Sequence, residues 1–468
     1  MYASTQRMDD HSRLANLSKP TKRTGPPVDV ASPASRSLCG PGMIKNVFVV
    51  GLSSSFVVGS SFLRGVILAR VLGPHEYGLA LILISITAAL DVFADAGIDR
   101  FIVQNRFGRR RDVMGTSHGF RVAGSGLVGL AIVAVSYPLS RVFHAPELVI
   151  AIALTGGVVT LRGFVNLSYK LQQRDRKFGA ETRILMAASG VDLAVTTIVA
   201  LKTGSFWAVL AGAYANATVH VILSHLLAEH SYSFIMRRRL IRLVGRFSLP
   251  IYINAIMLVA AVQGDRMVVA ASYSKSDLAF YAAACAIGQG LVGLASTVTM
   301  NTLLPVLAAR GAELAARRRQ NTRLGVLFVG GSTIFLLGLS AIGPFAVPLI
   351  YGPAFAGLAS LIFAAAVVQM IQVEQGWLTT LLMANGLTRE FPKITLLRAA
   401  AFPSAFAFVG LGLSILAIPL AFAVGATLSL AMSYYAARNL KLIDRRLIVA
   451  SFSRIAVALS VVVLLART

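Results

Sequence analysis

The chain has 468 residues, of which 56% are hydrophobic and only 13% are charged, and its mean hydropathy is +0.73. A soluble domain carries about a quarter charged residues, so this composition excludes a water-soluble protein and indicates a polytopic membrane protein. The net charge of +25 would suggest a nucleic-acid partner in a soluble protein, but in a membrane protein it indicates basic cytoplasmic loops. We therefore expect no nucleic-acid partner.

Residues 1–43 contain no apolar run and are expected to form a disordered, basic cytoplasmic tail. We expect no signal peptide, because the basic segment is not followed by a short apolar core and a small-residue cleavage site. Cys39 in this tail and Cys285 in an apolar run cannot build a disulfide framework, and no metal-ligand spacing occurs. We expect no metal and no cofactor.

Apolar runs of membrane-spanning length follow the tail. Runs of about twenty residues select helices, because membrane strands alternate over about ten residues. The expected spans are 44–71, 78–98, 119–142, 147–169, 183–203, 205–228, 247–271, 278–305, 324–349, 355–384, 394–411, 415–437 and 447–466. This pattern predicts an all-α fold of 12–14 spans, with thirteen as the central estimate.

The first two spans are joined by Leu72-Gly73-Pro74. Gly leaves the helical region easily and Pro has no amide hydrogen to donate, so this stretch predicts a hairpin between two long helices. A similar pattern returns at Asp265-Arg266, which is followed by a polar turn and Phe280-Tyr281-Ala282. Arg64 and Arg266 are equivalent in this alignment, which gives a repeat of 266 − 64 = 202 residues.

Positive charge alternates along the chain. Basic loops follow every second span, and the intervening turns are short and nearly free of Lys and Arg; the turns are 73–77, 144–147, 202–205, 272–277, 351–353 and 412–414. Short loops with this bias set orientation, so we expect the basic loops and the N-terminus to be cytoplasmic and the turns to face outward.

A second repeated stretch supports a build from two lobes. Residues 138–147 (PLSRVFHAPE) and 348–355 (PLIYGPAF) both lie between the third and fourth spans of their halves. We expect two repeat-related six-helix lobes around a central cavity. The expected parts after the tail are an N-terminal lobe (44–228), a cytoplasmic bridge (229–246), a C-terminal lobe (247–437), and a basic loop with an extra helix (438–468).

Four stretches together resemble a known family. They are residues 64–78 with Asp95-Ala96-Gly97-Ile98, residues 171–178, Asp265-Arg266 with 280–282, and residues 349–355. The chain resembles the bacterial polysaccharide biosynthesis transporters, the Wzx-type lipid-linked oligosaccharide flippases of the multidrug/oligosaccharidyl-lipid/polysaccharide exporter superfamily. The resemblance implies a MATE-like fold in the bacterial inner membrane. The extra thirteenth span departs from the usual twelve or fourteen.

The resemblance also implies a function and partners. It implies that undecaprenyl-diphosphate-linked repeat units cross the membrane by alternating access, for exopolysaccharide, capsule or O-antigen assembly. Membrane lipid and this glycan are the expected partners, with polysaccharide polymerase and export machinery as further ones. Tyr77-Gly78-Leu79-Ala80 replaces the Asp-Ala-Phe run of the related lipid II flippases, which therefore receive less weight.

Ionisable residues inside the expected spans are the candidates for function, because each costs about 2.5–3.5 kcal/mol at the centre of an isolated helix. Arg64 and Arg266 are the first candidates for binding the diphosphate, since a guanidinium binds two phosphate oxygens in one plane. The alternative is that each arginine reaches the outer interface or pairs with a neighbouring acid. Arg162 and Arg398 are further substrate candidates, with a helix-end anchor as the favoured alternative.

The acids are candidates for gating or ion coupling. Asp91 and Asp95 are four residues apart and share a helix face, where they could bind an ion, pair with Arg100 or the other lobe, or form a local salt bridge. Asp265 and Glu374 are open to the same alternatives, as is Asp192. Pro250 either permits bending of the seventh span or marks its start.

No nucleotide-binding P-loop, GxSxG or HExxH motif occurs, so we expect no catalytic residue and no enzyme. Two other functions remain open. A multidrug or organic-cation exporter of the same superfamily would need an acidic cavity. A membrane polysaccharide polymerase or ligase would need a larger outward loop than these turns provide.

Overall fold

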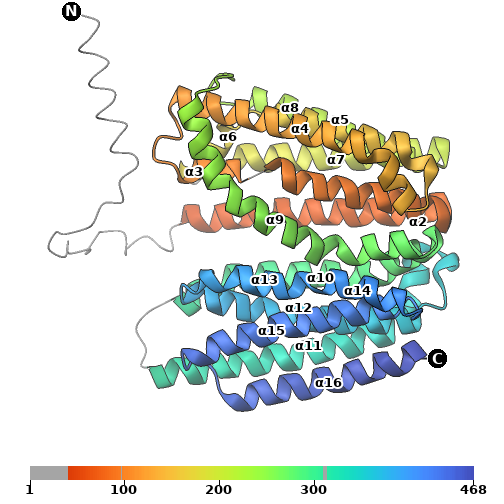
Figure 1. The fold of residues 1–468 in the computed structure, drawn as a ribbon. Helices are drawn as coiled ribbons and strands as arrows, with labels where there is room; N and C mark the ends of the chain where they lie inside the picture. The colour runs from red at the N-terminus through yellow and green to blue at the C-terminus, as the bar shows by residue number, and fades with distance from the viewer. Residues whose placement is uncertain (1–40, 96, 176, 309–313, 468) are drawn as a thin grey trace, which may run out of the picture. The chain divides into compact units, whose positions relative to one another are not determined.

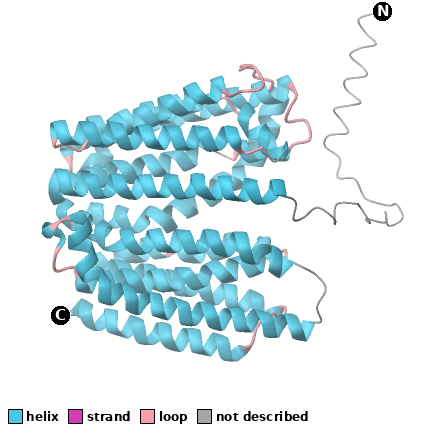
Figure 2. Cartoon of the chain, turned by 180° about the vertical axis from the view of Figure 1, so that it is seen from behind, coloured by secondary structure: helices cyan, strands magenta, loops and turns pink. Residues whose placement is uncertain are grey.

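The computed structural model describes residues 41–95, 97–175, 177–308 and 314–467, and within these ranges the chain is helical and has no strand (Figure 2). Residues 48–468 form one compact unit. Residues 1–40 of the predicted tail lie outside the described ranges. The predicted all-α fold is confirmed.

The predicted hairpin at Gly73 is present. Helix α2 (Pro41–Asp95) is interrupted at Gly73, whose φ of 72° and ψ of 171° are not helical. Glycine adopts this left-handed φ without steric cost, and Pro74 cannot donate the amide hydrogen that would continue the first arm. The chain therefore reverses direction at this residue, as the two arms of α2 in Figure 1 show.

One group of helices follows the second arm of α2. It comprises α3 (Ile98–Gln104), α4 (Arg111–Val142), α5 (Val149–Gly163), α6 (Ser168–Leu171), α7 (Gly179–Thr203) and α8 (Trp207–Leu226), with the 3₁₀ turns η2 (Pro146–Leu148) and η3 (Gln172–Asp175). Within this group α4 packs on α5, α5 on α8, and α7 on α8. We call these helices, with α2, the first helix group.

A second helix group contains the remaining helices after α9. It comprises α10 (Lys275–Ala308), α11 (Leu314–Tyr351), α12 (Ala359–Ala384), α13 (Phe391–Ala399), α14 (Ala401–Gly410), α15 (Ala417–Asn439) and α16 (Arg445–Arg467), with η4 (Pro353–Phe355) and η5 (Thr388–Glu390). Helix α12 is its centre, because it packs against α10, α11, α15 and α16.

Helix α9 (Arg238–Ser272) contacts both groups. It packs against α3 and α4 of the first group and against α13, α14 and α15 of the second, and it crosses obliquely between them (Figure 1). Pro250 lies twelve residues inside this helix. The alternative in which Pro250 starts the helix is therefore wrong, and the predicted bridge is helical from Arg238 onward.

Within the described ranges, twelve helices are long and apolar enough to cross a membrane, and the first of them contains the Gly73 hairpin. When the two arms of that hairpin are counted separately, the described ranges contain thirteen helical segments of spanning length, which agrees with the central estimate from the sequence. The expected span 394–411 is divided into α13 and α14 next to Ala400. Pro403 explains the break, because a proline removes a helical hydrogen bond and its ring clashes with the carbonyl four residues earlier.

The short turns gather at one end of the bundle, which we call the turn end. The Tyr273 hydroxyl donates a hydrogen bond to the Leu413 carbonyl at 2.9 Å, and the Ser414 hydroxyl lies 3.4 Å from the Ala466 carbonyl. Helix α16 therefore ends at the turn end (Figure 1).

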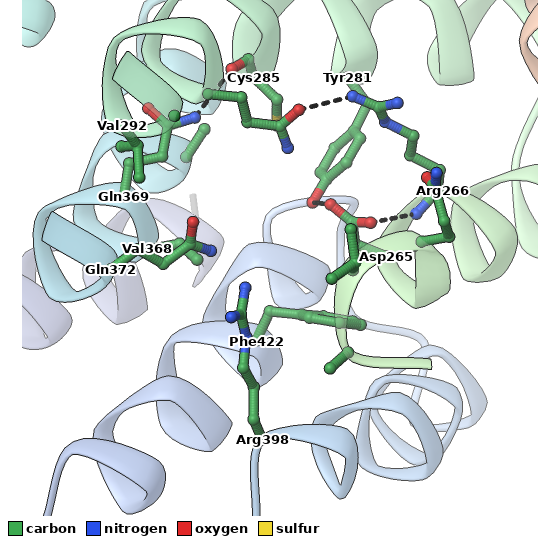
Figure 3. Close-up of a pocket in the computed structure, with 16 residues that line it drawn as sticks. Asp265, Arg266, Tyr281, Cys285, Val292, Val368, Gln369, Gln372, Arg398 and Phe422 are labelled. Atoms are coloured by element: carbon green, nitrogen blue, oxygen red, sulfur yellow. Dashed lines mark hydrogen bonds between the residues drawn. The ribbon is translucent and has the colours of Figure 1, made fainter. Parts of the chain in front are cut away.

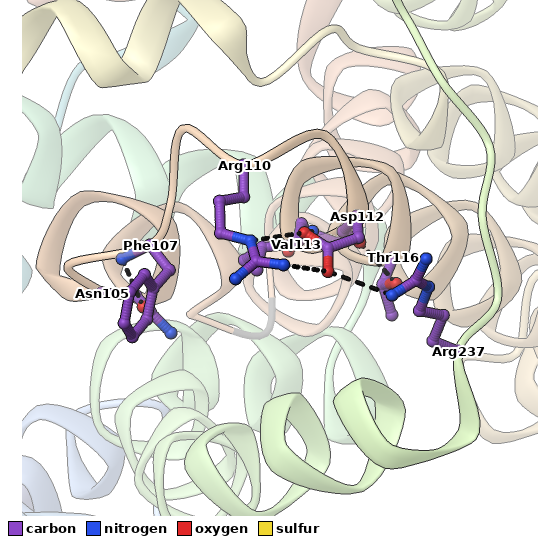
Figure 4. A network of polar contacts seen from close by, with 8 residues as sticks. Asn105, Phe107, Arg110, Asp112, Val113, Thr116 and Arg237 are labelled. Atoms are coloured by element: carbon purple, nitrogen blue, oxygen red, sulfur yellow. Dashed lines mark hydrogen bonds and ion pairs between the residues drawn. The ribbon is translucent and has the colours of Figure 1, made fainter. Parts of the chain in front are cut away.

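Ion pairs join the elements of the opposite end, which carries the basic loops and which we call the basic end. Asp112, in the first turn of α4, pairs with Arg110 at 3.2 Å and with Arg237 at 3.2 Å (Figure 4). Arg237 directly precedes α9, so Asp112 attaches the segment between the groups to α4. An acid in the first turn is also stabilised by the helix dipole.

Lys170 lies in a second ionic cluster at the basic end. Its ammonium group is 2.6 Å from Glu181 and 3.3 Å from Asp99, so it links α6 with α7 and α3. Burial disfavours the charged lysine, but the carboxylates of Asp99 and Glu181 outweigh burial and raise the pKa of Lys170 above its ordinary value. Lys170 therefore remains charged at every physiological pH.

Candidate functional site

A cavity of about 350 Å³ lies within the second helix group and α9 (Figure 3). It is bounded by α9, α10, α12, α13 and α15. Its polar and charged lining residues are Gln263, Asp265, Arg266, Tyr281, Gln289, Gln369, Gln372 and Arg398. This lining is unusual for a membrane interior, where polar side chains mark a substrate or ion pathway.

Asp265 and Arg266 enter the cavity from adjacent positions of α9. The Tyr281 hydroxyl donates to Asp265 Oδ2 at 3.0 Å, and the Arg266 amide donates to Asp265 Oδ1 at 2.8 Å. The Arg266 guanidinium instead donates to Gln289 Oε1 at 2.7 Å. The two opposite charges are neighbours in sequence, yet their side chains have different partners, as expected for adjacent positions on a helix.

Arg398 comes from the last turn of α13 and points into the same cavity (Figure 3). Its guanidinium makes no hydrogen bond to any other residue in the described ranges, although the charge of Asp265 acts on it. A half-buried cation without a hydrogen-bonded partner is costly, so this position favours a bound anion.

Glutamine side chains complete the lining. Gln369 is 2% exposed and donates through Nε2 to the Cys285 carbonyl at 2.8 Å, whereas its Oε1 accepts no hydrogen bond from a described residue. Gln372, one turn along α12, also lines the cavity. Amide groups can donate and accept, so they suit hydroxyl groups of a sugar as well as phosphate oxygens.

The charges of the cavity set its preference. Two guanidinium groups, from Arg266 and Arg398, face one carboxylate, from Asp265, which leaves one net positive charge. Guanidinium groups bind phosphate and carboxylate through paired hydrogen bonds. The geometry therefore suits a small anionic group better than an organic cation. Four arginines are predicted to bind substrate, and two of them, Arg266 and Arg398, line the same cavity.

Arg64 does not line this cavity. Its guanidinium forms an ion pair with Asp192 of α7 inside the first helix group, and both side chains are mostly buried. Thr196 donates to the other Asp192 oxygen at 3.1 Å. This contact matches the alternative prediction that Arg64 pairs with an acid. The sequence did not identify Asp192 as that acid.

Arg162 is also paired within the first helix group. It contacts the carboxylate of Asp91 and donates to Asn216 at 3.1 Å. Asp91 is therefore paired with Arg162 of α5, and among the described residues it forms no ion pair with Arg100 of α3. The side chain of Asp95 lies outside the described part of the structure, so its predicted role in gating remains a prediction.

Glu374 is 0% exposed and lies at the centre of a polar network. It forms an ion pair with Arg454 of α16, and it accepts hydrogen bonds from the hydroxyls of Tyr434 and Ser451. Arg454 also donates to Ser332 and Thr333 of α11. This network joins α11, α12 and α15 to the thirteenth span.

Sequence reasoning missed several of these residues. Arg454 was overlooked although it interrupts the apolar run 447–466, which was a usable signal. Gln289, Gln369 and Gln372 carry no charge and have no distinctive spacing, so nothing in the sequence singled them out. Lys275 lies in the turn 272–277, which is otherwise free of basic residues and gives no sign of a buried cation, yet only 7% of its surface is exposed.

Comparison with known proteins identifies the family. A model of the family described as "Polysaccharide biosynthesis protein" matches residues 67–360, more than half of the chain. The chain belongs to this family. The predicted resemblance is confirmed, and the matched region includes Arg266, Asp265 and the α10 and α11 segments, but ends before Arg398.

The chain is also similar to the succinoglycan biosynthesis transport protein ExoT of Rhizobium meliloti (strain 1021). It is 21% identical over 342 residues, which cover 72% of this chain and 66% of that protein. The match thus spans slightly less than two thirds of the relative's length.

Two solved structures share the fold. The lipid II flippase MurJ in an inward closed conformation matches with a TM-score of 0.64 and 14% identity, over 88% of this chain and 92% of that chain. An inward-facing multidrug resistance transporter of the MATE family, from the MOP superfamily, matches with a TM-score of 0.60 and 14% identity, over 87% and 98%. The predicted MATE-like fold is confirmed.

Proposed function

We propose that this chain is a flippase that moves undecaprenyl-diphosphate-linked oligosaccharide units across the bacterial inner membrane by alternating access. The family assignment supports a role in polysaccharide biosynthesis, and the shared fold supports membrane transport. The proposed orientation keeps the N-terminus and the basic end in the cytoplasm, following the distribution of Lys and Arg. The product is a glycan for exopolysaccharide, capsule or O-antigen assembly.

The cavity that contains Arg266 and Arg398 carries this proposal. A diphosphate is multiply anionic and needs cationic partners within the membrane, where water does not compensate its charge. Arg398 has no hydrogen-bonded partner among the described residues, and Arg266 is bound only to a neutral amide of Gln289. Both guanidinium groups can therefore donate hydrogen bonds to phosphate oxygens without breaking an ion pair. Arg64 and Arg162 would first have to leave Asp192 and Asp91.

The other two functions fit this cavity less well. An organic-cation exporter needs net negative charge, but the cavity has one carboxylate against two guanidinium groups. A polymerase or ligase needs an acid or base positioned at an outward loop. The proposed function therefore assigns the residues of the cavity to substrate binding and assigns no catalytic step.

A leaflet-resolved assay of lipid-linked glycan tests the proposal. Cells that lack the chain should accumulate undecaprenyl-linked units on the cytoplasmic face, and the wild-type chain should relieve this. Arg398→Glu and Arg266→Glu should each lower export at least about tenfold, because each replaces a charge-assisted contact by repulsion. Arg438→Glu is the matched control, since Arg438 is exposed at the basic end. Normal export by both cavity variants at normal protein level would contradict the proposed function.

A further inference from the structure

Two of the stretches that carry the family resemblance contact each other in the structure. They are residues 64–78 and residues 349–355. Tyr77 follows the Gly73 hairpin of α2, Tyr351 is the last residue of α11, and Phe355 is the last residue of η4. The rings of Tyr77 and Phe355 lie 6.4 Å apart at 75°, and those of Phe62 and Tyr351 lie 6.3 Å apart at 83°. Both pairs join the first helix group to the second.

These aromatic side chains are excluded from solvent. Tyr77 is 3% exposed, Tyr351 is 2% exposed and Phe355 is 1% exposed. Phe280 of α10 packs on Phe355 with ring centroids 5.6 Å apart. Edge-to-face pairs of this kind stabilise a contact beyond the area they bury. The turn end is therefore sealed by aromatic rings contributed from both helix groups.

A cation of the first group caps a helix of the second. Arg70, three residues before Gly73, donates through Nε to the Ile350 carbonyl at 2.7 Å and through a second nitrogen to the Leu349 carbonyl. These carbonyls belong to the last turn of α11, where the final four carbonyl groups have no partner within the helix. A positive charge is favourable there because of the helix dipole.

A cation of the second group makes the reverse contact. Lys275, the first residue of α10, donates through Nζ to the Phe143 carbonyl and lies 3.3 Å from the Ala270 carbonyl. Phe143 is the C-cap of α4. Helices α4 and α11 are the third spans of their halves, so each half supplies one cation that caps the third span of the other half.

We propose that Arg70, Lys275 and the aromatic residues Tyr77, Tyr351 and Phe355 form a gate that closes the cavity on the turn side. In the proposed cycle the two helix groups separate at this end and expose the cavity to the turn side, so the contacts of the gate would be broken and remade once in each cycle. The role of the gate in a transport cycle rests on the proposed function. The contacts that form the gate are the same whichever substrate is carried.

The gate is tested by access to the cavity from each side. Gly293 lines the cavity, and a side chain at this position would meet nothing within 4 Å. Gly293→Cys is therefore a suitable reporter in a chain that also carries Cys39→Ser and Cys285→Ala. A charged, membrane-impermeant methanethiosulfonate is added to right-side-out and to inside-out vesicles. Lys202→Cys, exposed at the turn end, shows in which vesicles the turns face the reagent.

Arg70→Met with Lys275→Met should raise the rate of labelling of Gly293→Cys from the turn side about tenfold or more, because several charge-assisted hydrogen bonds are lost. Lys202→Met, which removes a cation of the same end, should leave the rate unchanged. Arg70→Met alone is the second variant, since Arg70 is exposed and its loss should not impair folding; it should give a smaller increase in the same direction.

Unchanged labelling from the turn side in Arg70→Met and in the double variant, with normal melting temperatures, would overturn the gate. The readout does not involve glycan. If export assays contradicted the proposed substrate, the labelling result would still decide the gate, and the reverse also holds.

Discussion

Gly78 lies directly against the backbone of Lys275, at the point where the two helix groups meet. A Cβ at Gly78 would be 2.0 Å from the Lys275 carbonyl oxygen and 2.6 Å from its carbonyl carbon. Real Cβ atoms do not approach a backbone this closely, and a backbone carbonyl cannot rotate away as the end of a side chain can. Only glycine therefore allows α2 and α10 to come together in this arrangement.

Gly78→Ala should consequently separate the helix groups at the turn end. We expect faster labelling of a cavity cysteine from the turn side and weaker export, because the closed gate becomes the less stable state. Gly126→Ala is the matched control, since a Cβ at Gly126 would meet nothing within 4 Å, and its export should equal that of the wild type. Equal labelling of the two alanine variants would show that the close approach is not required for closure.

The sequence predicted the spans and the first hairpin well, and the reason is physical. Lipid leaves backbone groups no partner outside the helix, so an apolar run of sufficient length has essentially one structure available. Gly73 and Pro74 together mark a reversal, and the structure shows φ of 72° at Gly73. The break between α13 and α14 was not predicted, although Pro403 was visible in the sequence.

The contacts of the charged residues could not be predicted in the same way. Arg64 meets Asp192 and Glu374 meets Arg454 across separations of 128 and 80 residues. Such pairings depend on which helices become neighbours, and hydropathy carries no information about that. Arg64 and Arg266 are equivalent in the repeat, but their surroundings differ. Arg64 is paired with Asp192, whereas Arg266 lines the cavity.

The Arg64–Asp192 pair allows a test that separates stability from substrate binding. Arg64→Glu leaves two acids together in a mostly buried site and should lower both protein level and export. Arg64→Glu with Asp192→Arg restores an ion pair with the charges exchanged, so protein level and melting temperature should recover. If Arg64 also contacts the diphosphate, export should remain low in the exchanged variant. Recovery of export to the wild-type rate would restrict Arg64 to a structural role.

Asp265 offers a test of ion coupling. Asp265→Asn removes the carboxylate from the cavity and keeps an oxygen that can accept the Tyr281 hydrogen bond at this position. If the carboxylate takes up an ion during transport, export by the variant should become insensitive to an imposed sodium or proton gradient. The measurement is glycan export from vesicles with each gradient in turn. Unaltered stimulation by both gradients would exclude Asp265 as the coupling residue.

The Glu374–Arg454 pair should be among the most costly contacts to break. Glu374 is 0% exposed, and Glu374→Gln would leave the Arg454 charge buried without its counter-ion. Breaking a buried pair from one side typically costs about 3–5 kcal/mol, so we expect a large fall in melting temperature and loss of the contact between α12 and α16. Arg318→Gln is the matched control, because Arg318 and Asp444 form an exposed pair whose loss should cost under about 1 kcal/mol.

Removing both buried charges should be tolerated better than removing one. Glu374→Leu with Arg454→Met replaces the pair by apolar side chains of comparable size, which is often neutral for buried ion pairs. We expect its melting temperature to lie well above that of Glu374→Gln and its export to approach the wild-type rate. If the double variant were equally unstable, the hydrogen bonds of Tyr434 and Ser451 to Glu374 would be the dominant contribution. A stable double variant without export would instead assign this pair to the transport cycle, as the sequence pattern first suggested for Glu374.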